Sequence, residues 1–188
     1  LWVGGGPNGL SPNRHDDAVK ALDSFRNGTG NKFVLTKCQC CSREITVIKE
    51  TQEVKGIAEK NGKVIFVCYE GCEYDNKELP VMVVDDYLYV EPATILISTV
   101  DKFAQLAWQT GARKLIGIDV PSNGKYTPPS LIIQDELHLI SGPLGSVVGL
   151  YEPIFDVFQK MKGIRPPKVI ASTATISMAN EQVLALYG

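Results

Sequence analysis

Residues 131–138 read Leu-Ile-Ile-Gln-Asp-Glu-Leu-His, a short apolar run that leads directly into two adjacent carboxylates. A short run of this kind, without polar alternation, is typical of a strand buried in a parallel sheet. Asp135 and Glu136 then fall at the carboxyl end of that strand, the edge where open α/β sheets bind ligands. The stretch therefore predicts a parallel sheet with an acidic site at one edge.

Three other short apolar segments look like strands of the same kind, at residues 1–3, 94–97 and 168–171. Each is followed by a turn and usually by a helical pattern. Strands that alternate with helices indicate an α/β fold. We therefore expect a partial parallel sheet flanked by helices.

Helix start signals support this reading. Asn13 is the expected N-cap of a helix with acidic residues in its first turn and Arg26 at its end, and its apolar face is expected to be Ala18, Leu22 and Phe25. Thr99 is the expected N-cap of another helix. Gly142 precedes a long stretch with apolar residues at helical spacing. Residues 111–130 are rich in Gly and Pro and are expected to form a surface loop.

Residues 34–92 interrupt the α/β pattern. They contain all five cysteines and several strand-like alternations, but no convincing helical pattern. Asn61-Gly62 is a signal for a two-residue hairpin turn, which we expect to join strands at 45–47 and 64–66. This stretch is predicted to be a small inserted β subdomain.

The chain has 188 residues, which suits one domain with a small insert. We assign residues 1–33 and 93–188 to the α/β domain and residues 34–92 to the insert. No apolar run has the length of a membrane span and no signal peptide is visible, so a cytoplasmic location without membrane contact is expected.

Cys38 and Cys41 are separated by two residues, and Cys68 and Cys72 by three. Two such pairs on tight turns present four thiolates to a zinc ion. The site is expected to be structural and zinc-ribbon-like, because four thiolates leave no coordination position open for water or substrate. Cys40 competes for a place on the first turn, and an iron–sulfur cluster is the alternative metal group.

The net charge of -2 excludes a broad basic surface that binds duplex by charge alone, so any nucleic-acid contact must be local. Trp2, Phe103 and Trp108 could stack on bases. Aromatic residues on apolar faces are usually core residues, however, and we expect a core position for all three.

The stretch Asp135-Glu136-Leu137-His138 resembles the DExH box, which is motif II of the superfamily-two helicases. Other stretches match the family in the family's order: a glycine turn at 4–6, motif Ib at 98–101 and motif III at 173–175. This order is more specific than any single motif. The resemblance implies part of the first RecA-like motor domain of an ATP-dependent helicase or translocase.

A narrower resemblance is carried by residues 128–145 together with 100–103. These stretches look most like the large bacterial helicases of the DISARM anti-phage type. The resemblance implies a role in phage defence.

The family resemblance assigns roles to individual residues. Asp135 would hold magnesium, Glu136 would activate the attacking water, and His138 would contact the nucleotide or neighbouring motifs. Thr173 and Thr175 would couple ATP hydrolysis to movement. The residues expected to contact nucleic acid, with DNA favoured over RNA, are Gly5, Gly6, Thr99 and Asp101. ATP and Mg²⁺ are the implied cofactors of the full-length protein, in addition to structural zinc.

The sequence also departs from the family. It has no Gly-x-x-x-x-Gly-Lys-[Ser/Thr] loop to cradle nucleotide phosphates, and motif Ia and the second motor domain have no counterpart. We therefore expect a fragment of a longer helicase that is inactive by itself. Its incomplete sheet is expected to self-associate or to pair with the remainder of the helicase chain.

Two other functions stay open. The chain could be a zinc-stabilised nucleic-acid-binding or interaction module without ATPase activity. It could also be a metal-dependent hydrolase with Asp135, Glu136 and His138 as ligands, although adjacent residues on an extended chain point to opposite faces and do not converge easily.

Overall fold

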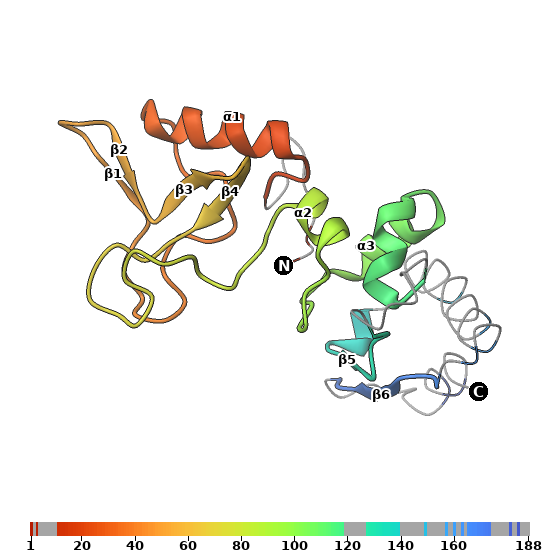
Figure 1. The fold of residues 1–188 in the computed structure, drawn as a ribbon. Helices are drawn as coiled ribbons and strands as arrows, with labels where there is room; N and C mark the ends of the chain where they lie inside the picture. Colours follow the sequence, from red (N-terminus) through yellow and green to blue (C-terminus); the bar gives the residue numbers. More distant parts are fainter. Residues whose placement is uncertain are drawn as a thin grey trace. The chain divides into compact units, whose positions relative to one another are not determined.

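The computed structural model describes residues 1, 3, 11–118, 127–139, 149, 157, 160, 163, 165–173, 181 and 184. The chain divides into two compact units, Leu1–Thr99 and Val100–Gly188. Both units contain helices and strands, so the chain has a mixed α/β structure (Figure 1).

The strands of the first unit form two antiparallel hairpins. β1 (Thr46–Ile48) pairs with β2 (Glu53–Lys55), and β3 (Ile57–Lys60) pairs with β4 (Lys63–Phe66). The turn predicted at Asn61-Gly62 is present, and both residues have the positive φ angles, 52° and 69°, that a type I′ turn requires.

The expected partner of the second hairpin strand was wrong. A two-residue turn can join only the strands that flank it directly, and these are β3 and β4. The stretch predicted at 45–47 overlaps β1 instead, which belongs to the other hairpin.

The helices of the first unit are α1 (His15–Arg26) and α2 (Asp85–Val90). α1 has the expected pattern, with two acidic residues in its first turn and Arg26 in its last. Its N-cap is Arg14 rather than Asn13, and the Arg14 side chain makes no capping hydrogen bond. The backbone N–H of His15 donates instead to Asp86 Oδ2 at 2.9 Å, so a residue of α2 satisfies the start of α1.

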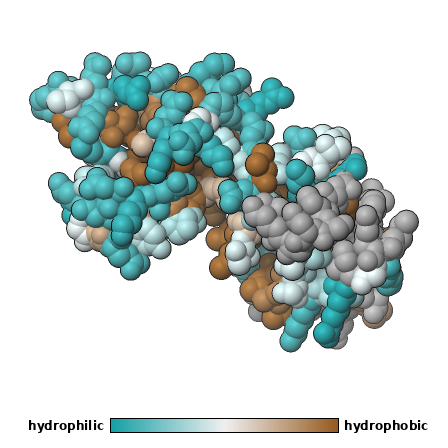
Figure 2. All heavy atoms as spheres, viewed as in Figure 1, coloured by the Kyte–Doolittle hydropathy of each residue, from teal (hydrophilic) through white to brown (hydrophobic). Residues whose placement is uncertain are grey.

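The core of the first unit lies between α1 and the β3–β4 hairpin, which α1 crosses in Figure 1. Leu22 of α1 and Phe66 of β4 are each 2% exposed, and Phe33 meets Phe66 edge-on with ring centroids 5.7 Å apart. Cys38 and Cys68 belong to the same buried cluster. The outer surface of this unit is mainly hydrophilic on the face seen in Figure 2.

This packing differs from the expected domain boundaries. Residues 1–33 were assigned with residues 93–188, but α1 shares its core with the cysteine-containing region. The apolar face of α1 was predicted from sequence, whereas the surface that it covers depends on tertiary packing and was not.

The second unit begins with short helices. α3 covers Val100–Phe103 and continues as the 3-10 helix η1 at Ala104–Ala107. A second 3-10 helix, η2 at Thr110–Ile116, occupies the start of the stretch that was expected to be a loop. Its Ala112, Leu115 and Ile116 are buried, which explains why this Gly-containing segment is ordered.

β5 (Leu131–Gln134) and β6 (Lys168–Ala171) pair in parallel, with Leu131 opposite Lys168 and Gln134 opposite Ala171. Both strands were predicted, and the parallel pairing is confirmed. The expected burial of both faces of these strands is not confirmed, because all four residues of β6 are exposed and Ile133 of β5 is 68% exposed. The described sheet has these two strands and no further partner among the described residues.

The other two predicted strands are absent from the described residues. Leu1 and Val3 are not in a strand, and residues 94–97 form bends and coil in which Ile95 is 80% exposed. No described strand offers backbone partners to either segment. Most of the helix predicted after Gly142 lies outside the described residues.

Candidate functional site

The first cysteine turn is built by backbone hydrogen bonds around Cys38. Cys38 N–H donates to the Arg43 carbonyl at 2.7 Å, and Ser42 N–H donates to the Cys38 carbonyl at 3.0 Å. Ser42 closes this turn with a φ of 62°. The N–H of Cys40 points at Cys38 Sγ, 3.4 Å away. The turn thereby offers a donor to one of its own sulfurs.

The second cysteine turn is built by the same kinds of hydrogen bond. Asn76 N–H donates to the Cys68 carbonyl and Asp75 N–H to the Cys72 carbonyl, each at 2.9 Å. Tyr74 N–H donates to Cys72 Sγ at 3.4 Å. In both turns an N–H two residues after a cysteine contacts that cysteine's sulfur, and such donors favour the thiolate that binds metal.

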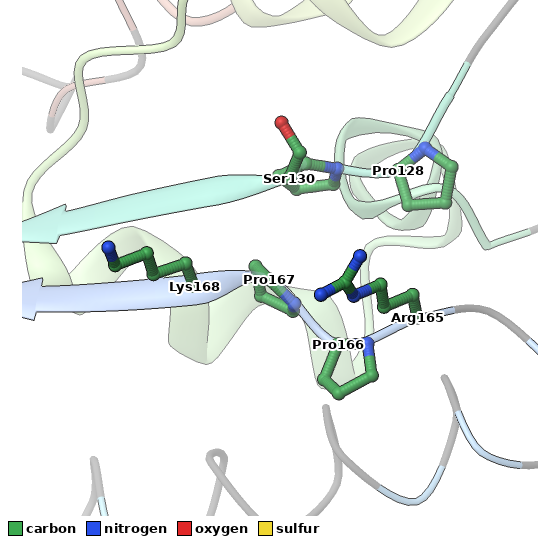
Figure 3. Close-up of a pocket in the computed structure, with 7 residues that line it drawn as sticks. Pro128, Ser130, Arg165, Pro166, Pro167 and Lys168 are labelled. Carbon is green, nitrogen blue, oxygen red and sulfur yellow. The ribbon is translucent and has the colours of Figure 1, made fainter.

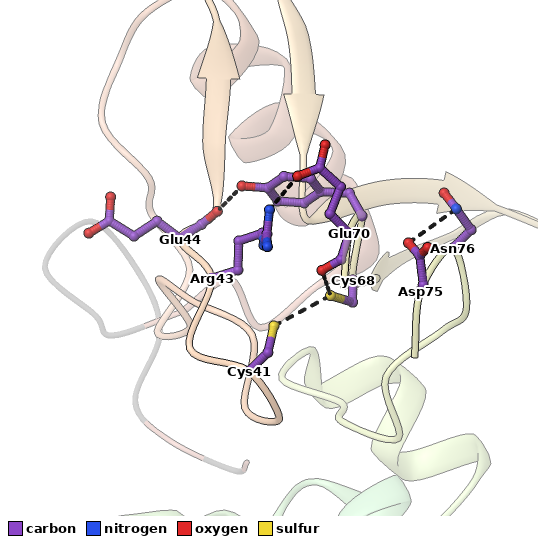
Figure 4. A network of polar contacts seen from close by, with 8 residues as sticks. Cys41, Arg43, Glu44, Cys68, Glu70, Asp75 and Asn76 are labelled. Atoms are coloured by element: carbon purple, nitrogen blue, oxygen red, sulfur yellow. Dashed lines mark hydrogen bonds and ion pairs between the residues drawn. The ribbon is translucent and has the colours of Figure 1, made fainter. Parts of the chain in front are cut away.

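The two turns bring four sulfurs together. The Sγ atoms of Cys38, Cys41, Cys68 and Cys72 all lie within 4.8 Å of one another. Cys41 Sγ is 3.6 Å from Cys68 Sγ, and Figure 4 shows this pair. In a tetrahedral zinc site with bonds of about 2.3 Å, neighbouring sulfurs are about 3.8 Å apart. The group therefore fits a metal ion such as zinc, and these are the four cysteines predicted as ligands.

The surroundings shift the pKa values of these thiols in opposite directions. A backbone hydrogen bond at Arg43 is the main reason that the pKa of Cys41 is lowered to about 7, and the other three sulfurs lower it further. A backbone hydrogen bond at Glu70 lowers the pKa of Cys68, but burial and the neighbouring sulfurs outweigh it and raise that pKa to about 12. One thiolate forms readily while the next is opposed, as expected for acidic groups that crowd together.

Arg43 ties the two turns together. Its guanidinium forms an ion pair with Glu70 and lies 5.5 Å from the centre of the Tyr69 ring. The Tyr69 hydroxyl donates to the Glu44 carbonyl at 2.9 Å, so contacts cross between the turns at several points (Figure 4). These contacts were not predicted from sequence.

The acidic motif lies at the carboxyl end of β5, as expected. Ser172 N–H donates to the Gln134 carbonyl at 2.8 Å, and Leu137 N–H donates to the Ser172 carbonyl at 2.9 Å. These two bonds continue the parallel pairing beyond the strands. Asp135 and Glu136 therefore lie at the same sheet edge as the segment that follows β6.

The side chains of the acidic motif interact with one another. Asp135 Oδ1 accepts a hydrogen bond from the Glu136 N–H at 3.0 Å, and Glu136 Oε2 lies 3.1 Å from His138 Nδ1. Glu136 has a φ of 53°, a left-handed conformation that is uncommon for a residue other than glycine. Among the described residues, the four-cysteine cluster is the one group with metal-ligand geometry, so Asp135, Glu136 and His138 do not assemble as a three-ligand metal site.

The remaining predicted site residues have different outcomes. Gly5, Gly6 and Thr175 lie outside the described residues, while Thr173 and Asp101 are exposed. Thr99 Oγ1 is buried and has no hydrogen-bond partner in the described part of the chain, so Thr99 does not act as the expected cap. α3, which follows Thr99, has only four residues before the chain continues as η1.

Two features were missed by sequence reasoning. Trp108 is 67% exposed rather than in the core. A pocket of about 680 Å³ lies at the amino ends of β5 and β6 (Figure 3). Its lining residues are Pro128, Pro129, Ser130, Arg165, Pro166, Pro167 and Lys168. A Pro-Pro pair precedes each strand in the sequence, and this repeated feature could have drawn attention to the pocket.

The fold and site define a mixed α/β chain with a four-cysteine cluster and an acidic sheet edge. No protein-family model matches the chain. The chain is 34% identical over 181 residues to the DISARM protein DrmA of Bacillus paralicheniformis, an alignment that covers 81% of this chain. The chain is therefore related to a DISARM protein and spans 16% of that protein's length. No described helix has the length and apolar character needed to cross a membrane.

Proposed function

We propose that this chain is part of the ATP-dependent motor of a phage-defence helicase or translocase that acts on nucleic acid, DNA in preference to RNA. The relationship to a DISARM protein supports the defence role. The similarity of the Asp135–His138 stretch to a DExH box supports the motor role. In this proposal the two described parallel strands are part of a larger RecA-like sheet.

The observation that carries the proposal is the pairing of β5 with β6. It brings the acidic motif and the segment Ser172-Thr173 to one sheet edge, and two backbone hydrogen bonds tie them together. A change of conformation at the acidic motif would therefore be transmitted to the segment after β6 through these hydrogen bonds. Such a link is what coupling of hydrolysis to movement requires.

Each side chain has a role that suits its chemistry. A carboxylate oxygen of Asp135 is a suitable ligand for Mg²⁺, which binds nucleotide phosphates in such motors. Glu136 is 55% exposed in its side chain and can accept a proton from an attacking water. His138 Nδ1 lies 3.1 Å from Glu136 Oε2 but makes no hydrogen bond within the described residues, and His138 is proposed to contact the nucleotide or neighbouring motifs. Thr173 and Thr175 are proposed to relay the change to nucleic acid, and Gly5, Gly6, Thr99 and Asp101 to contact its backbone.

The four cysteines are proposed to hold one structural zinc ion. Cys38 and Cys68 lie in the core of the first unit, Cys72 packs against it and Cys41 is exposed. The metal would fix the two turns against α1 and the β3–β4 hairpin. With four thiolates bound, zinc supplies stability and takes no part in the reaction.

The motor proposal is tested in bacteria that carry a DISARM-type system containing this chain. Glu136→Gln is expected to abolish protection in a plaque assay and ATP hydrolysis by the purified protein, while nucleotide binding persists. Glu50→Gln is the matched control, because Glu50 is an exposed turn residue of the first unit. Full protection by the Glu136→Gln variant would contradict the proposal.

The second candidate is a zinc-stabilised binding module without ATPase activity. The completeness of the cysteine cluster favours it. Under both candidates the isolated 188-residue chain hydrolyses no ATP. They differ in the defence assay, where the module predicts that Glu136→Gln is harmless and that loss of the zinc ligands is not.

A further inference from the structure

The side chain of Trp108 is exposed although its backbone is hydrogen-bonded. It is 67% exposed, at the junction of η1 and η2. Trp108 N–H donates to the Gln105 carbonyl at 3.2 Å, and Gln109 N–H donates to the same carbonyl at 2.7 Å. The next helical turns are anchored by buried residues of η2. The exposed indole thus extends from a backbone that is hydrogen-bonded on both sides of the junction.

Basic residues lie near this indole in the chain. Residues 102–118 include Lys102, Arg113 and Lys114, and this stretch lies between Asp101 and Asp119. Lys102 is buried, whereas Arg113 and Lys114 are partly exposed on η2. Arg113 Nε donates to the Leu106 carbonyl at 3.2 Å. This bond holds the guanidinium at Leu106, which is two residues before Trp108 in the chain. In a chain of net charge -2, this is a local cationic segment with an exposed aromatic ring.

An exposed aromatic ring beside cations is the combination that binds single-stranded nucleic acid. Bases stack on the ring whatever their sequence, and the cations attract the phosphate backbone. We propose that Trp108 stacks on a base of single-stranded nucleic acid, with Arg113 and Lys114 beside it to contact phosphate. This inference rests on the proposed function, because it names part of the motor's nucleic-acid surface.

Fluorescence tests the proposal directly, because the chain has two tryptophans. In a Trp2→Phe background Trp108 is the single reporter. The full 188-residue chain is titrated with an unlabelled oligodeoxythymidylate at low salt, and the emission of Trp108 is expected to be quenched to saturation. Trp108→Ala is expected to weaken binding of a labelled oligonucleotide roughly tenfold, measured by anisotropy, which is within the range for loss of one stacked base. Trp108→Phe, which keeps an aromatic ring, is expected to restore most of the affinity.

Three outcomes would overturn the proposal. If wild type and Trp108→Ala bind the oligonucleotide with equal affinity, the chain binds nucleic acid but Trp108 is not part of the contact surface. A change in sedimentation of Trp108→Ala without a change in affinity would make Trp108 a protein contact. Absence of oligonucleotide binding at any salt concentration would overturn the nucleic-acid part of the proposed function as well. Retention of the metal and an unchanged melting temperature establish that each variant is folded.

Discussion

Cys40 and Cys41 are neighbours in the chain with different surroundings. Cys41 Sγ lies in the cluster of four, whereas the exposed Cys40 is outside it and contributes its N–H to Cys38 Sγ. This backbone N–H stays in place when the Cys40 side chain is replaced. Burial is the main reason that the pKa of Cys72 is raised, and a contact with the Cys40 side chain adds to the rise. Cys40 is therefore a neighbour of the cluster and not one of its four ligands.

This difference predicts the outcome of two matched substitutions. Cys68→Ser removes a buried ligand and is expected to release the metal and unfold the first unit, since structural zinc contributes roughly 10 kcal/mol to small sites. Cys40→Ser is expected to leave both metal content and stability unchanged. Elemental analysis and thermal melting of the two variants provide the measurement. Zinc retained by Cys68→Ser would contradict the assigned ligand set.

The choice of ligands could be predicted from sequence because each cysteine pair is held by local turns of a few residues. The ties between the turns could not. The Arg43–Glu70 ion pair joins residues 27 positions apart, and no local pattern indicates it. The capping role expected of Thr99 failed for a related reason. The α-helix that it was expected to cap ends after four residues and continues as a 3-10 helix, which no local pattern indicates.

Tyr87 is a residue on which three elements meet. Its hydroxyl oxygen accepts a hydrogen bond from Val64 N–H at 3.0 Å and lies 2.8 Å from His15 Nδ1, so it joins α2 to β4 and α1. Burial raises the pKa of Tyr87. The folded chain therefore prefers the neutral phenol.

This preference predicts a pH dependence at the alkaline end. Because the pKa of Tyr87 is raised on folding, its contribution is fully present below pH 10 or so and is lost as the pH rises toward the folded pKa. Tyr87→Phe is expected to lower the free energy of unfolding at neutral pH by about 1 to 3 kcal/mol, since the buried Val64 N–H loses its partner. It is also expected to flatten the decline above pH 10. Urea unfolding at several pH values measures both effects, and an equally steep decline in the variant would contradict them.

At the scale of elements, two glycines show how the hairpins of the first unit are fixed. Gly62 has a φ of 69° in the tight turn, with open space where a side chain would be. Gly56, between β2 and β3, has a φ of 96°, and a Cβ there would lie 2.7 Å from Ile45 Cγ1. Gly62 serves a turn, whereas Gly56 also allows two segments to pack closely.

The two positions are therefore expected to respond differently to alanine. Gly62→Ala should cost about 1 to 2 kcal/mol, the strain of a left-handed residue with a Cβ. Gly56→Ala should cost about 1 to 3 kcal/mol more, because the added methyl group also overlaps Ile45. The free energies of unfolding from urea titrations give the comparison. An equal loss of stability at both positions would show that the Ile45 contact yields without cost.

Elements were predicted well where a local signal defines them. The Asn61-Gly62 turn, the face of α1 and the strands β5 and β6 all follow from patterns of a few residues. Pairings and burial were predicted less well. Which strand lies beside β4, and what covers α1, depend on contacts between segments far apart in sequence. The strand expected at 94–97 failed for the same reason, because a strand needs a partner with free backbone groups.

At the scale of the whole molecule, the two units differ in how they use their apolar residues. In the first unit β4 is buried, and its Val64, Ile65 and Phe66 are each at most 8% exposed. In the second unit, apolar residues of both parallel strands are exposed, with Ile133 at 68% and Ile170 at 45%. Parallel sheets occur almost only where both faces are covered. The β5–β6 sheet is therefore a surface that favours association.

We predict that the 188-residue chain self-associates through the β5–β6 sheet. Pairing along a strand edge and burial of exposed Ile and Val side chains both favour contact with a second copy, and a net charge of -2 opposes it only weakly. Ile133→Lys places a charge on this sheet and is expected to shift the chain toward monomer in sedimentation velocity runs at increasing concentration. Ile95→Lys is the matched control, because Ile95 is 80% exposed but belongs to the first unit and to no strand. A wild-type chain that stays monomeric at high concentration would contradict the prediction, and equal effects of the two variants would show that association does not use the sheet.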